Sequence, residues 1–379
     1  MSVSVGNLEL HTGPSSVGGP DDLDAAIRAF IGATKHSLAI AVQELDSKSV
    51  ASAILTAKAA HEAARKPGED RLGVQLILEG DYLTEESPLT DPWLPSGANE
   101  RNREIHAAML RAGVDVVTDL NPNIFHQKFI VRDVDTDNAA VLTGSTNFTL
   151  TDTGLNTPAN GGDASGNNLN HIVILRGRTA ASQYQNEFER MRDSGTFGAL
   201  HERVEARPKE FRIGDVRVKP LFAPRHGPEM EIIKQMLKAK VSIDFAMYTF
   251  AASSGIDDAM FRLRPGLARI RGIIDRTQGR QTWTPAAALK AAGIDLHMNK
   301  KGVGVRKVHH KLMVIDECIT IVGSFNYTAP ANTLNDENII VIGDLDEQPG
   351  SAADVGQRAI AAYAVAEIER MIGQLGEPA

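Results

Sequence analysis

The sequence predicts an α/β fold made of two tandem α/β/α sandwich modules, related by a pseudo-twofold axis and built on mixed sheets flanked by helices. Two observations predict it. Short segments recur in the same order at nearly one spacing: Glu187–Met191 returns as Glu367–Met371, and Ala112–Asp115 returns as Ala292–Asp295, which indicates two copies of one unit. Within each copy, apolar runs of strand length alternate with amphipathic helical patterns, as is typical of layered α/β architectures.

A polar stretch at 207–215, which contains Pro208 and Gly214, separates the two copies. We therefore expect a first module at residues 1–206, a connecting segment at 207–215 and a second module at residues 216–379. The length of 379 residues agrees with this division, because globular domains hold about 150 residues each.

The elements of the first copy follow in order. It opens with a helix from Pro20, because the apolar residues that follow recur at helical spacing and share one face. After it we expect two strands, Leu38–Val42 and Val74–Leu78, and then a helix at Glu100–Ala112. Loops are expected at Leu83–Ala98 and Thr151–Asn168.

The second copy repeats this order. Its first helix is expected near Pro228, where Met, Ile and Leu residues again align on one face. The elements expected after it are strands Ser242–Met247 and Ile270–Ile274 and helix Pro285–Ala292.

The composition is that of an ordinary globular protein, with 42% hydrophobic and 23% charged residues. The 40 Lys and Arg against 48 Asp and Glu leave a net charge of −8, which argues against indiscriminate coating of nucleic acid. The single cysteine, Cys318, excludes a disulfide framework and a Cys-rich zinc site. The sequence shows no apolar run of about 18 residues and no signal-peptide pattern, so we expect a cytoplasmic protein without an integral membrane segment.

The most informative segments are two copies of the pattern His-x-Lys-x4-Asp, one in each module. Alternate residues of a strand share a face, so each histidine should project together with its lysine, whereas the aspartate should face the other way and have a structural role. The two motifs are His126, Lys128 and Asp133 in the first copy and His309, Lys311 and Asp316 in the second.

Each motif is followed by Gly-Ser-x-Asn, which contributes Ser145 and Asn147 in the first copy and Ser324 and Asn326 in the second. The glycine permits a tight turn, after which the serine and asparagine should project together. The alternative to a functional site is a purely structural role, in which these polar residues form hydrogen bonds at buried strand ends. Two copies of the whole series are far beyond chance.

Two histidines, two lysines and two asparagines in one place would suit a phosphate group. Ammonium groups and amides bind an anion with several oxygens. One imidazole can attack phosphorus while the other protonates the leaving oxygen, a division of labour that requires no metal or other cofactor.

With these paired motifs the sequence resembles the phospholipase D superfamily over nearly its whole length. The resemblance implies a bilobal fold with one active site at the pseudo-twofold interface, a phosphodiester substrate, a covalent phosphohistidine intermediate and no metal. A single chain would suffice for one composite site. The family more often uses the first histidine as nucleophile, which favours attack by His126 and proton donation by His309.

The resemblance also implies a carboxylate, downstream of Gly-Ser-x-Asn, that orients a catalytic histidine. Glu337 fits this role in the second copy, whereas Asn170 stands at the matching position of the first. An amide oxygen accepts an imidazole N–H but stabilises an imidazolium less than a carboxylate does. Each orienting group can serve the histidine of its own copy or that of the other copy. His310 is interpreted as a packing or hydrogen-bonding residue.

Three substrate classes compete, and a nuclease acting on DNA or RNA is favoured. The observation is a basic segment that leads into the second histidine and suits a polyanion. A phospholipase D or phosphatidyl transferase is the alternative; Trp93 and Trp283, in corresponding loops, could hold an acyl chain, stack on bases or pack within their loops. A binding module with an inactive site is the third class, against which the complete motif set argues. The residues expected to bind substrate are Ser145, Ser324, Asn170 and the basic segment Lys300, Lys301, Arg306 and Lys307.

Overall fold

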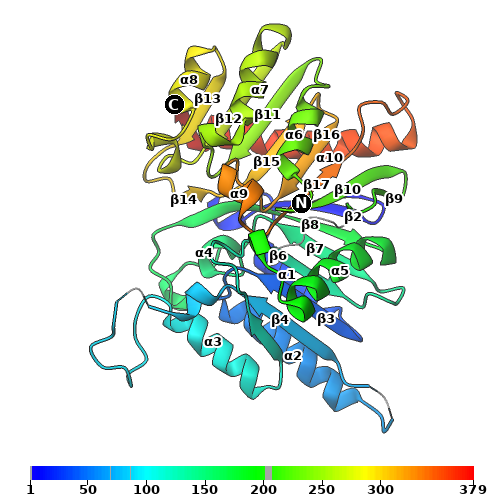
Figure 1. The fold of residues 1–379 in the computed structure, drawn as a ribbon, viewed down its shortest axis with the longest axis vertical. Coiled ribbons are helices and arrows are strands. Elements are labelled where there is room, and N and C mark those ends of the chain that lie inside the picture. The colour runs from blue at the N-terminus through cyan, green and yellow to red at the C-terminus, as the bar shows by residue number, and fades with distance from the viewer. Residues whose placement is uncertain (1, 69, 86, 201–206) are drawn as a thin grey trace.

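The computed structural model describes residues 2–68, 70–85, 87–200 and 207–379. In these residues two sheets of nine strands each lie one above the other along the long axis of the molecule (Figure 1). The strands of the first copy, in blue to green, form most of the lower sheet, and later strands, in green to red, form the upper one. The expected pair of α/β modules is therefore confirmed.

The first sheet combines parallel and antiparallel strands. Its strands are β1 (Val3–Val5), β2 (Leu8–Gly13), β3 (Ser37–Val42), β4 (Gly73–Leu78), β5 (Asp115–Thr118), β6 (Lys128–Arg132), β7 (Ala140–Gly144), β8 (Asn167–Arg176) and β14 (Val305–Val308). They follow the order β1-β2-β8-β7-β6-β3-β4-β5, and β14 also pairs with β8. Strands β3, β4 and β5 run parallel, whereas β6 is antiparallel to β3.

The second sheet repeats this topology. Its strands are β9 (Phe211–Ile213), β10 (Val216–Ala223), β11 (Ser242–Met247), β12 (Arg269–Ile274), β13 (Asp295–Asn299), β15 (Lys311–Ile315), β16 (Ile319–Gly323), β17 (Glu337–Ile342) and β18 (Gly376–Pro378). Eight of these strands follow the order β9-β10-β17-β16-β15-β11-β12-β13, which matches the path of the first sheet strand for strand, and β18 adds a ninth strand beside β13. The two copies recognised in the sequence therefore share the same order of strands in their sheets.

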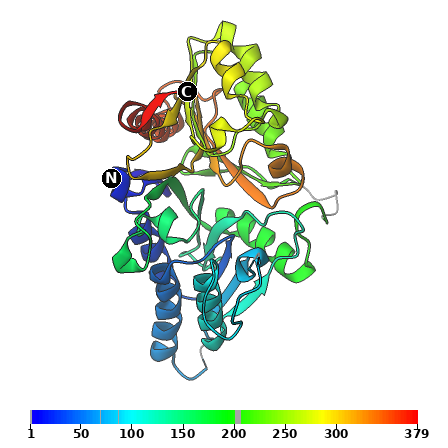
Figure 2. The same ribbon diagram turned by 90° about the vertical axis from the view of Figure 1, so that its left-hand side faces the viewer.

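Helices cover the outer face of each sheet, and a shared core lies between the sheets (Figure 2). The helices are α1 (Leu23–Gly32), α2 (Lys48–Ala64), α3 (Glu100–Arg111), α4 (Leu150–Thr153), α5 (Arg178–Ser194), α6 (Pro228–Met236), α7 (Ile256–Leu263), α8 (Ala286–Ala291), α9 (Ala329–Thr333) and α10 (Ala352–Arg370). Helices α1 to α3 pack on the first sheet and α6 to α8 on the second. Helices α5 and α10 join strands of both copies in one continuous apolar core.

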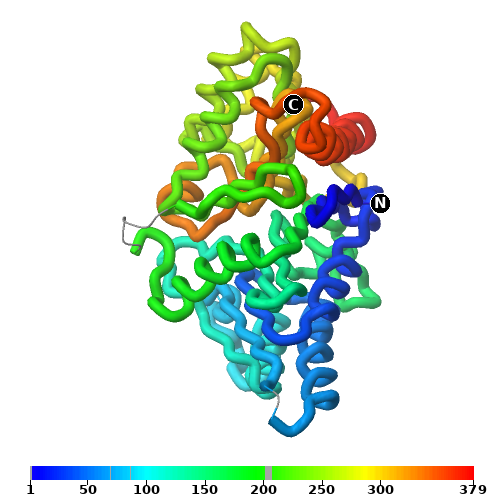
Figure 3. The backbone as a smooth tube through the Cα atoms, turned by 90° about the vertical axis from the view of Figure 1, so that its right-hand side faces the viewer, coloured from blue at the N-terminus to red at the C-terminus, as the bar shows by residue number. Residues whose placement is uncertain are grey.

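The two modules interlock more than the expected boundaries imply. Strand β14 belongs to the second copy but lies in the first sheet. Helix α10, near the C-terminus, packs against β1 at the N-terminus, as the neighbouring red and dark blue segments of Figure 3 show. The proposed boundary at residue 206 lies outside the described residues.

Most expected elements form, with small shifts at their ends. The first helix begins at Leu23 rather than Pro20, because the side chain of Asp22 accepts the N–H of Ala25 and caps the helix there. The expected loop Thr151–Asn168 is interrupted, since its first residues lie in α4 and its last two begin β8. No helix among the described residues is long and apolar enough to cross a bilayer.

Candidate active site

Each motif histidine lies just before a central strand and is tied to the other copy through its backbone. The N–H of His126 donates to the carbonyl of Asp336 at 2.9 Å, and the N–H of His309 donates to the carbonyl of Leu169 at 2.9 Å. These two bonds are related by the pseudo-twofold axis. They bring both histidines to the seam between the modules.

The side chains of the two histidines are oriented across the same seam. Nδ1 of His126 lies 2.6 Å from Oε2 of Glu337, and Nδ1 of His309 lies 2.9 Å from Oδ1 of Asn170. Each imidazole is therefore held by a residue of the other copy, which resolves the pairing that the sequence left open. With Nδ1 engaged, Nε2 of each ring is the nitrogen available to a substrate.

A buried carboxylate that the sequence reasoning missed stands behind Asn170. Oδ1 of Asp152 accepts from Nδ2 of Asn170 at 2.9 Å and lies 3.7 Å from Nδ1 of His309. At the matching position of the Gly-Ser-x-Asn turn the second copy has Ala331. The first copy therefore places a carboxylate behind Asn170, near His309 of the second copy, and an alignment of the two copies could have revealed it.

Ser145, Ser324 and Asn170 do not take the expected place in contact with substrate. The hydroxyl of Ser145 donates to Oδ1 of Asn170 at 2.8 Å, and that of Ser324 donates to Oε2 of Glu337 at 2.6 Å. All three side chains are fully buried behind the imidazoles. This is a correction: hydrogen bonds turn both serines back toward the orienting groups, so they fix Asn170 and Glu337 instead of facing the cavity.

The glycines of Gly-Ser-x-Asn are required by the backbone. Gly144 and Gly323 have φ of 155° and 152°, and a Cβ at either position would lie 2.3 Å or less from a carbonyl of the neighbouring strand. The turns carry Asn147 and Asn326 to the wall of the cavity described below. Oδ1 of Asn147 is buried and has no hydrogen-bond partner within the part of the chain that the structure describes, which leaves it available to a ligand.

The motif aspartates have the structural role that their spacing predicts. The carboxylate of Asp133 accepts three backbone N–H groups at the start of β3, from Lys35 to Ser37. Asp316 accepts three in the same way at the start of β11, from Lys240 to Ser242. Each aspartate thus ties the end of its motif strand, β6 or β15, to the start of the neighbouring strand, β3 or β11.

A cavity of about 410 Å³ lies where the two copies meet. The expected site residues that line it are His126, Asn147, Arg306, Lys307, His309 and Asn326. Lysines 128 and 311 lie beneath it, nearly inaccessible to solvent. Their ammonium groups donate to the carbonyls of His126 and His309, at 2.8 and 2.9 Å.

Burial disfavours the protonated forms of the lysines and of His309 while the cavity holds no anion. Burial lowers the pKa of Lys128 to about 7. Burial and the nearby Lys128 also lower the pKa of Lys311. Burial, together with Lys311, lowers the pKa of His309 well below its ordinary value. A bound phosphodiester would supply the missing negative charge and favour the protonated forms.

The lining of the cavity contains acidic as well as basic side chains. The first copy contributes Glu44 and Asp46, at positions where the second copy has Thr249 and Ala251. Burial, followed by repulsion from Asp46 and Asp152, raises the pKa of Glu44 to about 8. These acidic residues were not anticipated from the sequence, although comparison of the two copies reveals them.

The basic segment divides in two. Arg306 and Lys307 line the cavity, and the Lys307 ammonium lies 5.2 Å from the ring centre of Tyr248. Lys300 and Lys301 do not line it, and the Lys300 ammonium instead donates to the carbonyl of Gln374. Of the basic segment expected to bind substrate, two residues therefore line the catalytic cavity and two lie outside its lining.

The residues next to the catalytic motifs form two related bridges between the modules. On one side, Asn338 Nδ2 donates to Gln127 Oε1 at 2.8 Å. On the other, the rings of His171 and His310 stack with their Nδ1 atoms 3.1 Å apart. His171 Nε2 accepts the N–H of Gly323, so the network assigns the proton between the rings to His171.

Comparison with known proteins agrees with this geometry. Residues 27–192 and 232–351 match the family model described as "Cardiolipin synthase, PLD-like domain". Since these segments make up most of the chain and one lies in each module, the protein belongs to the phospholipase D superfamily. Its activity class is therefore that of the superfamily's phosphodiesterases.

Individual relatives are more distant. The chain is 31% identical over 140 residues to a protein named phospholipase D from Rickettsia conorii, a match that covers 36% of this chain and 68% of that protein. It is 30% identical over 103 residues to a mitochondrial cardiolipin hydrolase from Chlamydomonas reinhardtii, covering 27% and 44%. The crystal structure of phosphatidylserine synthase from Haemophilus influenzae superposes with a TM-score of 0.64 at 12% identity, over 100% of this chain and 88% of that one, which shows the fold alone.

Proposed function

We propose that this protein hydrolyses phosphodiesters through a covalent phosphohistidine intermediate, without a metal, at one site shared by both modules. The observation that carries the proposal is the crossed pairing of His126 with Glu337 and of His309 with Asn170. It leaves two imidazole Nε2 atoms for a phosphate in one cavity. The asymmetry of the two orienting groups assigns different roles to the two histidines.

His126 is the nucleophile in this proposal. The carboxylate oxygen Oε2 of Glu337 accepts from the hydroxyl of Ser324 and lies 2.6 Å from Nδ1 of His126, where it accepts the ring N–H. Nε2 then carries a free lone pair. When Nε2 bonds to phosphorus the ring becomes cationic, and the Glu337 carboxylate compensates that charge.

His309 is the general acid and then the general base. In the first step the N–P bond forms at His126 while the P–O bond breaks, and the leaving oxygen takes the proton from Nε2 of His309. In the second step His309 takes a proton from water, whose oxygen displaces His126 from phosphorus. The neutral amide of Asn170 makes His309⁺ a stronger acid than a directly bonded carboxylate would.

Both substrate classes remain candidates for this chemistry. Arg306 and Lys307 at the cavity support a nucleic acid. The lysine pair 300 and 301 lies elsewhere, and Glu44 and Asp46 at the cavity wall offer no positive charge to a second phosphate. The names of the relatives, which include phospholipase D and cardiolipin hydrolase, favour a phospholipid.

The decisive experiment traps the intermediate. Methyl p-nitrophenyl phosphate has a leaving group that departs without a proton, so the His309→Ala variant should form the adduct but fail to hydrolyse it. Quenching in base and mass spectrometry should then find the phosphoryl group on His126. An adduct on His309 in the His126→Ala variant would exchange the two roles. Full turnover by either variant would contradict the two-histidine mechanism.

A further inference from the structure

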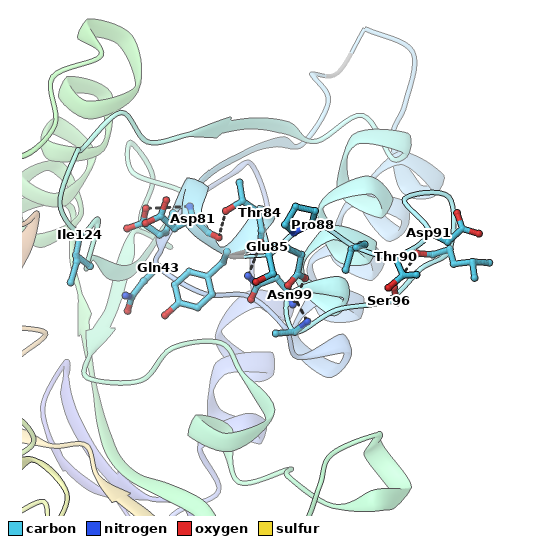
Figure 4. A pocket seen from close by; sticks show the side chains of 16 residues that line it. Gln43, Asp81, Thr84, Glu85, Pro88, Thr90, Asp91, Ser96, Asn99 and Ile124 are labelled. Carbon is cyan, nitrogen blue, oxygen red and sulfur yellow. Dashed lines mark hydrogen bonds between the residues drawn. The ribbon is translucent and has the colours of Figure 1, made fainter.

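A second and larger cavity adjoins the catalytic one. It has a volume of about 1100 Å³ and lies between the 79–99 segment and the start of α3 (Figure 4). Gln43, Tyr82 and Ile124 line both cavities, so these three side chains lie at the border between the two. Gln43 also accepts a hydrogen bond from the buried ammonium of Lys128 at 3.1 Å, which places the junction beside the phosphate-binding lysine.

This groove exists because the first copy carries a longer connection. Residues 79–99 join β4 to α3, whereas the shorter segment 275–285 joins β12 to α8 in the second copy. The long connection is held at its base, because Glu85 accepts the N–H of Asn99 at 2.9 Å and pairs with Arg103 at 2.8 Å. The groove is thus preformed.

The lining combines apolar and acidic groups. Leu89, Leu94 and Ile124 supply apolar surface, and Asp81 and Asp91 are exposed carboxylates. Among the described residues that line the groove, none is a lysine, arginine or histidine. A nucleic acid strand carries one negative charge per phosphate along its whole length, and laid along this groove it would place further phosphates beside the carboxylates.

We propose that this groove binds the organic substituent of the phosphodiester, and that this substituent is an amphipathic alcohol with an apolar chain and no anionic charge, as in a glycerophospholipid. The inference rests on the proposed function, since it assumes that the phosphate binds between the two histidines. It assigns the groove to substrate selection. A polynucleotide would have to leave the site by another route.

The test compares two arginine substitutions in adjacent residues. Leu94 lines the groove, whereas Trp93 does not and is 91% exposed. The substrate is short-chain phosphatidylcholine below its critical micelle concentration, which removes any effect of a lipid surface. Loss of the apolar contact and insertion of a charge in Leu94→Arg should raise KM about tenfold or more. Trp93→Arg should leave KM within about twofold. Ser96→Trp, which fills the groove without adding charge, should act like Leu94→Arg.

The controls separate this inference from the proposed function. Methyl p-nitrophenyl phosphate is too small to reach the loop, so it reports on the catalytic cavity alone, and Trp93→Arg should hydrolyse it at the wild-type rate. Wild-type protein that fails on this small diester would refute the proposed function. Two results would overturn the groove assignment alone, provided that the wild type hydrolyses the small diester. One is an unchanged KM for phosphatidylcholine in Leu94→Arg. The other is that the wild type does not hydrolyse phosphatidylcholine at all. Faster cleavage of a single-stranded oligonucleotide by Leu94→Arg would identify the groove as a nucleic acid path.

Discussion

Nδ1 of His126 lies 2.6 Å from Oε2 of Glu337, a residue 211 positions later in the chain and in the other copy of the duplicated module. The reciprocal contact joins His309 to Asn170. Neither half of the chain therefore contains a complete catalytic unit, because each histidine depends on the other half for its orientation. The two halves also differ, since one orienting group is a carboxylate and the other an amide backed by Asp152.

Replacing Glu337 by Gln should lower kcat for methyl p-nitrophenyl phosphate by about 10²- to 10⁴-fold. An amide at this position no longer compensates the imidazolium charge and can select the wrong tautomer. Steady-state kinetics of the purified variant measures the effect. Glu231→Gln is the matched control, because Glu231 is also a buried carboxylate but pairs with Lys219, away from the histidines. An equal loss of kcat in both variants would show a general effect of removing a buried charge.

Replacing Asp152 by Asn should move the alkaline limb of the kcat/KM profile to lower pH by about one unit. His309 acts in its protonated form, and a carboxylate 3.7 Å from its Nδ1 favours that form. Removal of the charge lowers the pKa of His309, so activity is lost at a lower pH. Asp46→Asn changes another cavity carboxylate that does not bond to Asn170 and should move this limb less. An upward shift in Asp152→Asn would contradict the assigned role.

The stacked pair His171 and His310 should make stability depend on pH. Burial lowers the pKa of His171 to about 3, and burial together with His171 and Arg370 lowers the pKa of His310. The unfolded chain therefore binds more protons below the ordinary histidine pKa of 6.5. Stability must fall as the pH drops below that value, by up to about 1.4 kcal/mol per pH unit for each histidine.

A double substitution tests this origin of the pH dependence. His171→Asn combined with His310→Gln copies the Gln127–Asn338 bridge of the other side, which has no titrating group. Urea unfolding at pH 5 and pH 8 should show a smaller stability difference than in the wild type. Each single substitution should cost about 1–3 kcal/mol at pH 8, because it leaves a buried partner unpaired. An unchanged pH dependence in the double variant would assign it to other groups.

Replacing Arg306 and Lys307 by Gln should raise KM for the anionic methyl p-nitrophenyl phosphate several-fold and weaken its dependence on ionic strength. Both side chains line the catalytic cavity, where their charge attracts the phosphate. The matched control replaces Lys300 and Lys301 by Gln, which removes the same charge from outside the cavity. Equal changes in KM for both double variants would indicate a long-range effect of net charge.

Chelation should leave activity unchanged. The described site residues themselves supply a nucleophile, a proton donor and cations for the phosphate, so no step in the proposed mechanism requires a metal. The measurement is hydrolysis of methyl p-nitrophenyl phosphate after dialysis against EDTA. Activity that disappears with EDTA and returns with Mg²⁺ would contradict the mechanism.

The local pattern of the chain predicted most of the fold. Strands such as β11 and β12 are short segments rich in apolar residues, which located them in the sequence, and the internal repeat predicted that the second copy follows the order of the first. The motif residues His126 and His309 were also evident, because a repeated spacing is visible without any knowledge of contacts.

Long-range packing decided the rest. No local pattern shows that Glu337 reaches His126, that Asp152 stands behind Asn170, or that hydrogen bonds withdraw Ser145 and Ser324 from the cavity. Hydrogen bonds and electrostatic contacts depend on distances of a few ångströms between atoms. Periodicity states which face of a strand a side chain occupies. The partner on that face is set by how the two copies dock, and here that docking pairs each histidine with a residue of the opposite copy.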